Sequence, residues 1–212
     1  MSGILFNADP EPKAARLRIF PTNLLLIDNI GVNIKPLYEY ILKDYHENET
    51  RIYQMRELYK HKIFDDLIMQ IQMNSTNFCS MLKYKYENLK VTDVWANVLQ
   101  PGEMHPPHTH SNNILSGVFF LTGGPNIIFT DPRAQAATID PVKEHTVDNC
   151  NNVEYQALPK RMIIFPAWLQ HWVPGNKMNV PRVSISWNVM LEGRVGGDLQ
   201  SSDWHDIHDS FK

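Results

Sequence analysis

The hydrophobic period of this chain changes near residue 89, and that change restricts the fold to one with helices first and strands afterwards. Upstream, apolar side chains recur every three or four positions, the spacing that gives an amphipathic helix one buried face. Downstream, short runs rich in β-branched and aromatic residues are separated by Gly, Pro, Asn and Asp. These strand-like runs are residues 89–99, 114–121, 126–130, 161–165 and 182–190. Helices followed by many short strands predict an α+β fold whose β part is a sandwich or a barrel.

The helical part is expected to contain three helices. The first covers residues 33–45, with Asn33 as the N-cap; a second runs through 55–59 and a third through 64–71. Before them, an apolar run interrupted by Pro21 predicts a strand on either side of a kink. The chain is expected to form one domain, made of an N-terminal arm (1–16), a mainly helical support (17–88), a β core (89–191) and a tail (192–212).

Composition argues against several classes of protein. A formal charge of -3 and an isoelectric point near 6.3 give no basic field, so a nucleic-acid partner is unsupported. Only Cys79 and Cys150 occur, without a CxxC pair, which fits a reducing compartment and argues against a thiolate metal site. No apolar run approaches the roughly 18 residues of a membrane span. We expect a cytoplasmic protein, in the host cytoplasm if a phage encodes it, with a homodimer left open.

Three histidines fall close together just before the second strand run. They are His105, His108 and His110, within residues 102–117. On extended backbone, side chains at i and i+2 point to the same side, so His108 and His110 can converge on one ion. A further histidine, His171, follows a strand run and can supply a third nitrogen. Three nitrogen ligands leave open coordination positions, as in a catalytic metal site.

An arginine lies in the last strand run, where burial is costly. Arg182 and Ser184 alternate onto one face of this run, which is otherwise apolar. A buried arginine requires an anionic partner. The partner can be an internal carboxylate, for example Asp131, or a bound ligand carboxylate.

These segments together resemble the iron(II)- and 2-oxoglutarate-dependent oxygenases, and in particular the family of such oxygenases met in bacteria and tailed phages. The resemblance covers about residues 89–191 and implies a double-stranded β-helix, a jelly-roll or cupin-like barrel, with the N-terminal helices packed on it. The segments that carry it are Pro101-Gly102, His108-Thr-His110, Leu115-Ser-Gly-Val-Phe-Phe-Leu121, Phe129-Thr-Asp-Pro-Arg133, Ile164-Phe-Pro-Ala-Trp-Leu-Gln-His171 and Arg182-Val-Ser-Ile-Ser-Trp-Asn188.

The resemblance implies a set of metal ligands. His108 and His171 correspond to iron ligands, and His110 stands where most of the wider superfamily has Asp or Glu. Asp131 is an alternative source of a carboxylate. His105, which precedes Pro106 and has no matching position in the family pattern, is left out of the ligand set.

The resemblance also implies the cosubstrate and the reaction. Arg182 and Ser184 would hold the distal carboxylate of 2-oxoglutarate, and Asn97 and Asn188 are candidates to point into the same barrel. The implied activity is a dioxygenase reaction that decarboxylates 2-oxoglutarate to succinate and carbon dioxide and hydroxylates a substrate. That substrate is a small molecule or a side chain of unknown identity. Trp172 is a candidate wall of the site.

Two other functions remain open at this point. The first histidine segment also resembles a cupin motif, which implies a metal-dependent dioxygenase or isomerase without 2-oxoglutarate, although Ile114 and Leu115 stand where that motif expects a glutamate. The second open function is that of a non-catalytic binding protein that keeps the barrel. Residues 134–157 are the candidate substrate cover, by length and polarity. The remaining histidines are assigned to the surface: His46, His61, His145, His205 and His208.

Overall fold

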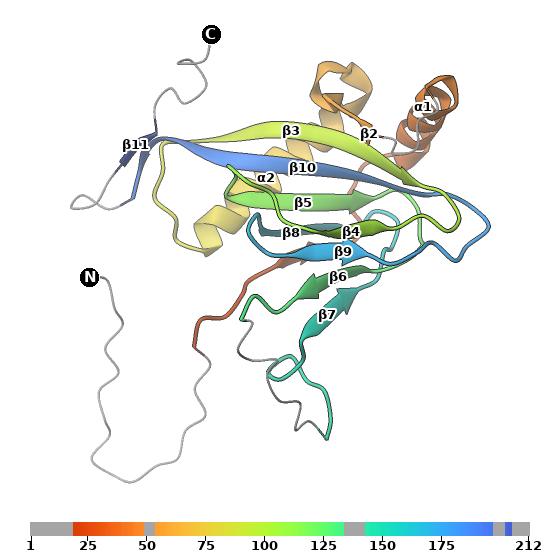
Figure 1. Cartoon of the computed structure of the whole chain (residues 1–212). Helices are drawn as coiled ribbons and strands as arrows, with labels where there is room; N and C mark the ends of the chain where they lie inside the picture. The colour runs from red at the N-terminus through yellow and green to blue at the C-terminus, as the bar shows by residue number, and fades with distance from the viewer. Residues whose placement is uncertain (1–18, 49–53, 134–142, 197–201, 205–212) are drawn as a thin grey trace, which may run out of the picture.

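The computed structural model describes residues 19–48, 54–133, 143–196 and 202–204. Two antiparallel sheets form the body of the protein, and Figure 1 shows them stacked one over the other. The larger sheet has seven strands in the order β1-β8-β5-β10-β3-β2, with β11 also paired to β10, and the smaller has four in the order β4-β9-β6-β7. The predicted α+β architecture with N-terminal helices is therefore confirmed. The N-terminal arm, His205 and His208 lie outside the described residues.

The elements follow in chain order. They are β1 (Leu25–Ile27), α1 (Ile34–Glu47), β2 (Gln54–Met55), the 3-10 helices η1 (Leu58–Lys60) and η2 (Lys62–Phe64), α2 (Asp65–Met81), β3 (Asn88–Leu99), β4 (His105–His108), β5 (Leu115–Phe120), β6 (Ile127–Thr130), β7 (Asn152–Tyr155), β8 (Met162–Pro166), β9 (His171–Val173), β10 (Arg182–Val195) and β11 (Ser202–Trp204).

The helices pack on the outer face of the larger sheet. Helix α1 begins at the predicted N-cap, where Asn33 Oδ1 accepts a hydrogen bond from the Lys35 amide at 3.4 Å. Apolar residues of both helices share one core with the odd-numbered residues of β10. The alternation along β10 therefore turns Val183, Ile185 and Trp187 toward the helices and leaves the even-numbered residues facing the smaller sheet.

A second core fills the space between the two sheets. Val118 and Phe120 of β5 meet Phe129 of β6, Phe165 of β8 and Leu169 there. Histidines of the smaller sheet and Arg182 of the larger one lie in this same interlayer space. The fold thus brings the candidate site residues inside the stack of sheets.

Three local predictions were wrong. Residues 55–59 do not form a helix, because Glu57 adopts a left-handed φ of 58° between β2 and η1. The apolar run before α1 contains one short strand, β1, and Pro21 lies outside it. The end of the 134–157 segment is not a loop, since β7 pairs with β6 and completes the smaller sheet.

No helix among the described residues is long and apolar enough to cross a membrane.

Candidate active site

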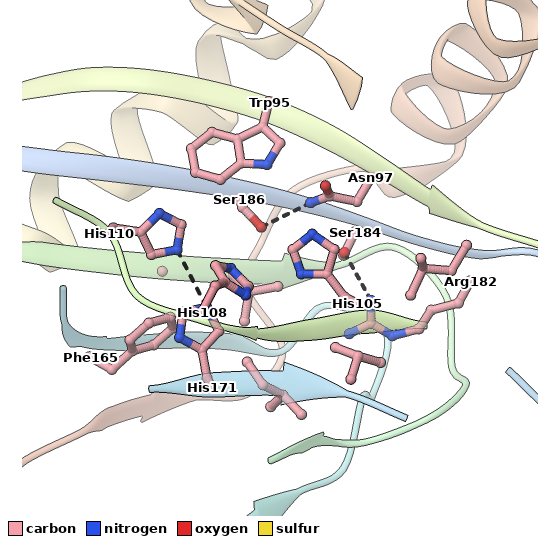
Figure 2. A pocket seen from close by; sticks show the side chains of 15 residues that line it. Trp95, Asn97, His105, His108, His110, Phe165, His171, Arg182, Ser184 and Ser186 are labelled. Carbon is pink, nitrogen blue, oxygen red and sulfur yellow. Dashed lines mark hydrogen bonds between the residues drawn. The ribbon is translucent and has the colours of Figure 1, made fainter. Parts of the chain in front are cut away.

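The three predicted histidines converge between the sheets, as Figure 2 shows. His108 ends β4, His110 follows two residues later, and His171 begins β9, where it pairs in register with His108. One nitrogen atom from each ring lies within 4.8 Å of the other two. In the described residues this is the one group of three or more His, Cys, Asp or Glu side chains arranged to hold a metal ion.

Backbone carbonyls fix the orientation of two of these rings. His108 Nδ1 donates to the carbonyl of Pro106 at 2.8 Å, and His171 Nδ1 donates to the carbonyl of Leu169 at 3.0 Å. Because a carbonyl can only accept, each Nδ1 carries the proton and each Nε2 presents a lone pair. A histidine that binds a metal through Nε2 uses its other nitrogen in this way. The rings are therefore prepared for a cation.

Burial keeps two of the three ligand rings, those of His110 and His171, neutral. Burial, with a smaller contribution from the neighbouring histidines, lowers the pKa of His171 to about 3 and the pKa of His110 to about 4. Both rings are consequently uncharged at neutral pH. A metal ion competes with no proton for them there, and the donor set fits Fe(II).

Arg182 lies in the same cavity with its charge uncompensated. Its side chain is 2% exposed; Nε donates to the Pro125 carbonyl and Nη1 donates to Ser184 Oγ, both at 3.1 Å. The guanidinium also lies over the ring of Phe120, 5.1 Å from its centroid. No salt bridge to Arg182 occurs among the described residues. Burial lowers its pKa to about 10, so the group stays cationic at neutral pH and suits a bound carboxylate.

Asp131 fills neither of the roles considered for it. Its carboxylate forms an ion pair with Arg133 at 2.8 Å and accepts the Arg133 backbone amide, and this pairing lowers its pKa. It does not line the cavity that contains the histidines and Arg182. The cavity therefore has no carboxylate ligand from Asp131.

The two predicted asparagines differ in position. Asn97 lines the cavity from β3 and donates Nδ2 to Ser186 Oγ at 3.1 Å. Asn188 shares a face of β10 with Arg182 but lies beyond the cavity, where its Oδ1 accepts a hydrogen bond from Ser116 at 2.6 Å. Trp172 does not wall the site, because it lies between His171 and Val173 on β9 and points to the other face.

Residues that sequence reasoning missed also line the cavity. His105 contributes a ring whose centroid is 4.5 Å from that of His108. Trp95 is 6% exposed, its ring centroid lies 5.7 Å from that of His110, and its buried Nε1 has no hydrogen-bond partner. The alternation of β3 could have identified Trp95, because it shares a face with Asn97.

The other described histidines lie away from this cavity. His46 and His145 are exposed, whereas His61 is partly buried and its Nδ1 bonds to the Tyr40 hydroxyl at 2.9 Å. A separate open groove that contains Trp168 and Phe129 is lined by Val147, Asp148, Cys150 and Asn151. The described part of the predicted cover does not reach the histidine cavity, and residues 134–142 lie outside the described residues.

Comparisons with known proteins agree with this geometry. Residues 93–188 match the family model described as "Putative 2OG-Fe(II) oxygenase". No curated protein matches the chain.

Solved structures share the fold at low identity. A prolyl-4-hydroxylase from Pseudomonas putida matches with a TM-score of 0.58 and 11% identity, over 81% of this chain and 89% of the other. The alpha-ketoglutarate-dependent carbocyclase SnoK from nogalamycin biosynthesis matches with a TM-score of 0.60 and 12% identity, over 90% of this chain and 87% of the other. An oxidoreductase of the 2OG-Fe(II) oxygenase family from Burkholderia pseudomallei matches with a TM-score of 0.56 and 10% identity, over 79% of this chain and 84% of the other.

The stacked antiparallel sheets are those of the double-stranded β-helix that these solved structures share, and a group of three histidines that could hold a metal ion lies inside them. Within this fold, residues 93–188 of the chain match the model of the 2OG-Fe(II) oxygenase family and contain the three histidines. The protein is an enzyme, and its cofactors are Fe(II) and 2-oxoglutarate.

Proposed function

We propose that this enzyme is a dioxygenase that hydroxylates an organic substrate and converts 2-oxoglutarate to succinate and carbon dioxide. The observation that supports this most directly is the unpaired Arg182, buried in the same cavity as the histidine group. A buried cation without a partner is costly, and a dicarboxylate that reaches from the metal to Arg182 would relieve that cost.

In this proposal each residue has one task. His108, His110 and His171 hold the iron, and Arg182 with Ser184 binds the far carboxylate of 2-oxoglutarate. When bound, the iron would activate dioxygen, which is the oxidant, and 2-oxoglutarate would supply two electrons as it is converted to succinate and carbon dioxide; no side chain of the chain can supply this chemistry. Phe165 and Phe129 pack against His171, with ring centroids 4.6 and 6.0 Å away, and exclude water from that side.

The ligand set affects the charge of the site. Three neutral histidines leave the centre one negative charge short of the usual set with a carboxylate. With Fe(II), Arg182 and doubly charged 2-oxoglutarate, the site keeps one net positive charge. A substrate with an anionic group near the metal would therefore be favoured over a cationic one.

A cupin-type enzyme that does not use 2-oxoglutarate is the second candidate. It requires the histidines but gives no reason to bury Arg182 beside them. Ile114 and Leu115, at the positions of the missing cupin glutamate, provide no ligand atom. The arginine therefore favours the first proposal.

The test is turnover without a known substrate. Purified protein supplied with Fe(II), 2-oxoglutarate and oxygen should release succinate slowly, and His171→Ala should abolish that release. Compounds that accelerate the release in a screen of amino acids, peptides, nucleotides and sugars would identify the substrate class. Absence of succinate, together with absence of 2-oxoglutarate binding in calorimetry, would overturn the proposal in favour of a cupin-type or binding function.

A further inference from the structure

A bulge in β4 turns a fourth histidine into the cavity. His105 pairs with Val173 and His108 pairs with His171, so three steps along β4 correspond to two steps along β9. In a regular strand, residues three apart face opposite sides of the sheet. The extra residue of the bulge puts His105 and His108 on the same side of the sheet instead. The exposed Pro106 and Pro107 occupy the bulge. Proline has no backbone N–H to donate. Because β4 is an edge strand, the sheet loses no hydrogen bond between strands at these two prolines.

The ring of His105 lies between the metal ligands and the arginine. Figure 2 shows it between the ring of His108 and the side chain of Ser184, close to Arg182. The two ring centroids of His105 and His108 are 4.5 Å apart. Within the described part of the chain, neither ring nitrogen of His105 has a hydrogen-bond partner. A donor is thus available beside the arginine.

His105 does not belong to the metal group. Only the other three histidines place nitrogen atoms within 4.8 Å of one another. The position of its ring toward Ser184 and Arg182 assigns it instead to the opposite end of the cavity, where an anion is expected.

We propose that His105 is a cosubstrate-binding residue that donates a ring N–H hydrogen bond to the carboxylate held by Arg182 and Ser184. The inference rests on the proposed function. It assigns to the protein a third donor for this carboxylate, from a strand of the smaller sheet opposite β10. The carboxylate would then be bound from both sheets, which fixes the direction of the whole dicarboxylate relative to the iron.

The test compares two ligands in Fe(II)-loaded protein without oxygen. Calorimetry would measure the Kd of 2-oxoglutarate and of 2-oxobutyrate, which keeps the metal-binding keto acid but lacks the far carboxylate. His105→Phe, which keeps a planar ring without a donor, should weaken 2-oxoglutarate binding about tenfold, the effect of one lost hydrogen bond to a charged group. It should leave 2-oxobutyrate binding and iron stoichiometry unchanged. His105→Gln, which keeps a donor, should recover part of the loss, and the exposed His145→Phe should change nothing.

The possible results separate the hypotheses. Equal weakening of both ligands, loss of iron, or unchanged 2-oxoglutarate binding in His105→Phe would overturn the role of His105. If the wild-type protein binds iron but does not bind 2-oxoglutarate, the proposed function itself fails.

Discussion

The Nε2 atoms of His110 and His171 lie 3.4 Å apart, although 61 residues separate them in the chain. The proton of His171 is on Nδ1, where it bonds the Leu169 carbonyl, so its Nε2 offers a lone pair toward His110. The two rings are nearly parallel, with an interplanar angle of 18°. In a buried cavity they bind a shared cation better than a proton, because burial disfavours the charged ring.

Substitution of one ligand tests this arrangement. His171→Ala should lower the affinity for Fe(II) about 100-fold or more, because two histidines cannot replace three converging donors. Metal analysis after desalting should find one iron per chain in the wild type and in His145→Ala, and much less in His171→Ala. Full retention of iron by the His171 variant would contradict the assignment.

Removal of the buried charge should separate folding from cosubstrate binding. Arg182→Met keeps the length of the side chain and removes a cation that has no acidic partner among the described residues. We expect the metal-loaded variant to unfold at the same temperature as the wild type or higher. Without oxygen, 2-oxoglutarate at about 100 times its Kd should stabilise the wild type by about 2.7 kcal/mol and leave Arg182→Met unaffected.

Arg133→Met is the control that shows whether the loss of any arginine has the same effect. Arg133→Met removes an exposed arginine that pairs with Asp131 outside the cavity. 2-Oxoglutarate should stabilise Arg133→Met as much as it stabilises the wild type. If Arg182→Met alone unfolds several degrees lower, Arg182 is a folding residue.

Sequence reasoning succeeded where a strand is long or a spacing is rigid. The twelve and fourteen residues of β3 and β10 carry enough alternation to place Asn97, Arg182 and Ser184 on the correct face. The His108-x-His110 spacing similarly brings two rings to one side. These features depend on local geometry alone, which is why they could be predicted.

It failed where an element is short or irregular. Strand β9 has three residues, too few for a periodic pattern, so the outward position of Trp172 was missed. The inward position of His105 depends on a bulge that is defined by pairing with β9. Pairing between strands distant in sequence has no local signal, and this limited the prediction of the site.

The two cysteines should differ in reactivity. Cys79 is fully buried in α2, and burial raises the pKa of its thiol to about 11, so about one molecule in a thousand carries the thiolate at pH 8. Cys150 is partly exposed. At pH 8 a thiol reagent should therefore label one cysteine in the native protein and two in guanidinium. Cys150→Ser should remove the native signal, and fast labelling of that variant would contradict the burial of Cys79.

Gly117 in β5 should tolerate no larger side chain, because Trp187 packs directly against it. A Cβ atom on Gly117 would overlap the six-membered ring of Trp187, which is fully buried under the helices. Gly117→Ala should lower the free energy of unfolding by about 2 to 3 kcal/mol, because neither backbone nor indole has room to move. Gly31→Ala, where nothing lies within 4 Å of the added atom, is the control and should change stability by about 0.5 kcal/mol or less.

A second substitution distinguishes this overlap from a general weakening of β5. Trp187→Phe removes the ring atoms that the new methyl group would meet, at the cost of a cavity. The double variant should therefore be more stable than the sum of the two single effects predicts, by about 1 kcal/mol or more in denaturant titration. Additive effects would mean that Gly117 is required for its backbone conformation, and the packing of Trp187 would then not explain the glycine.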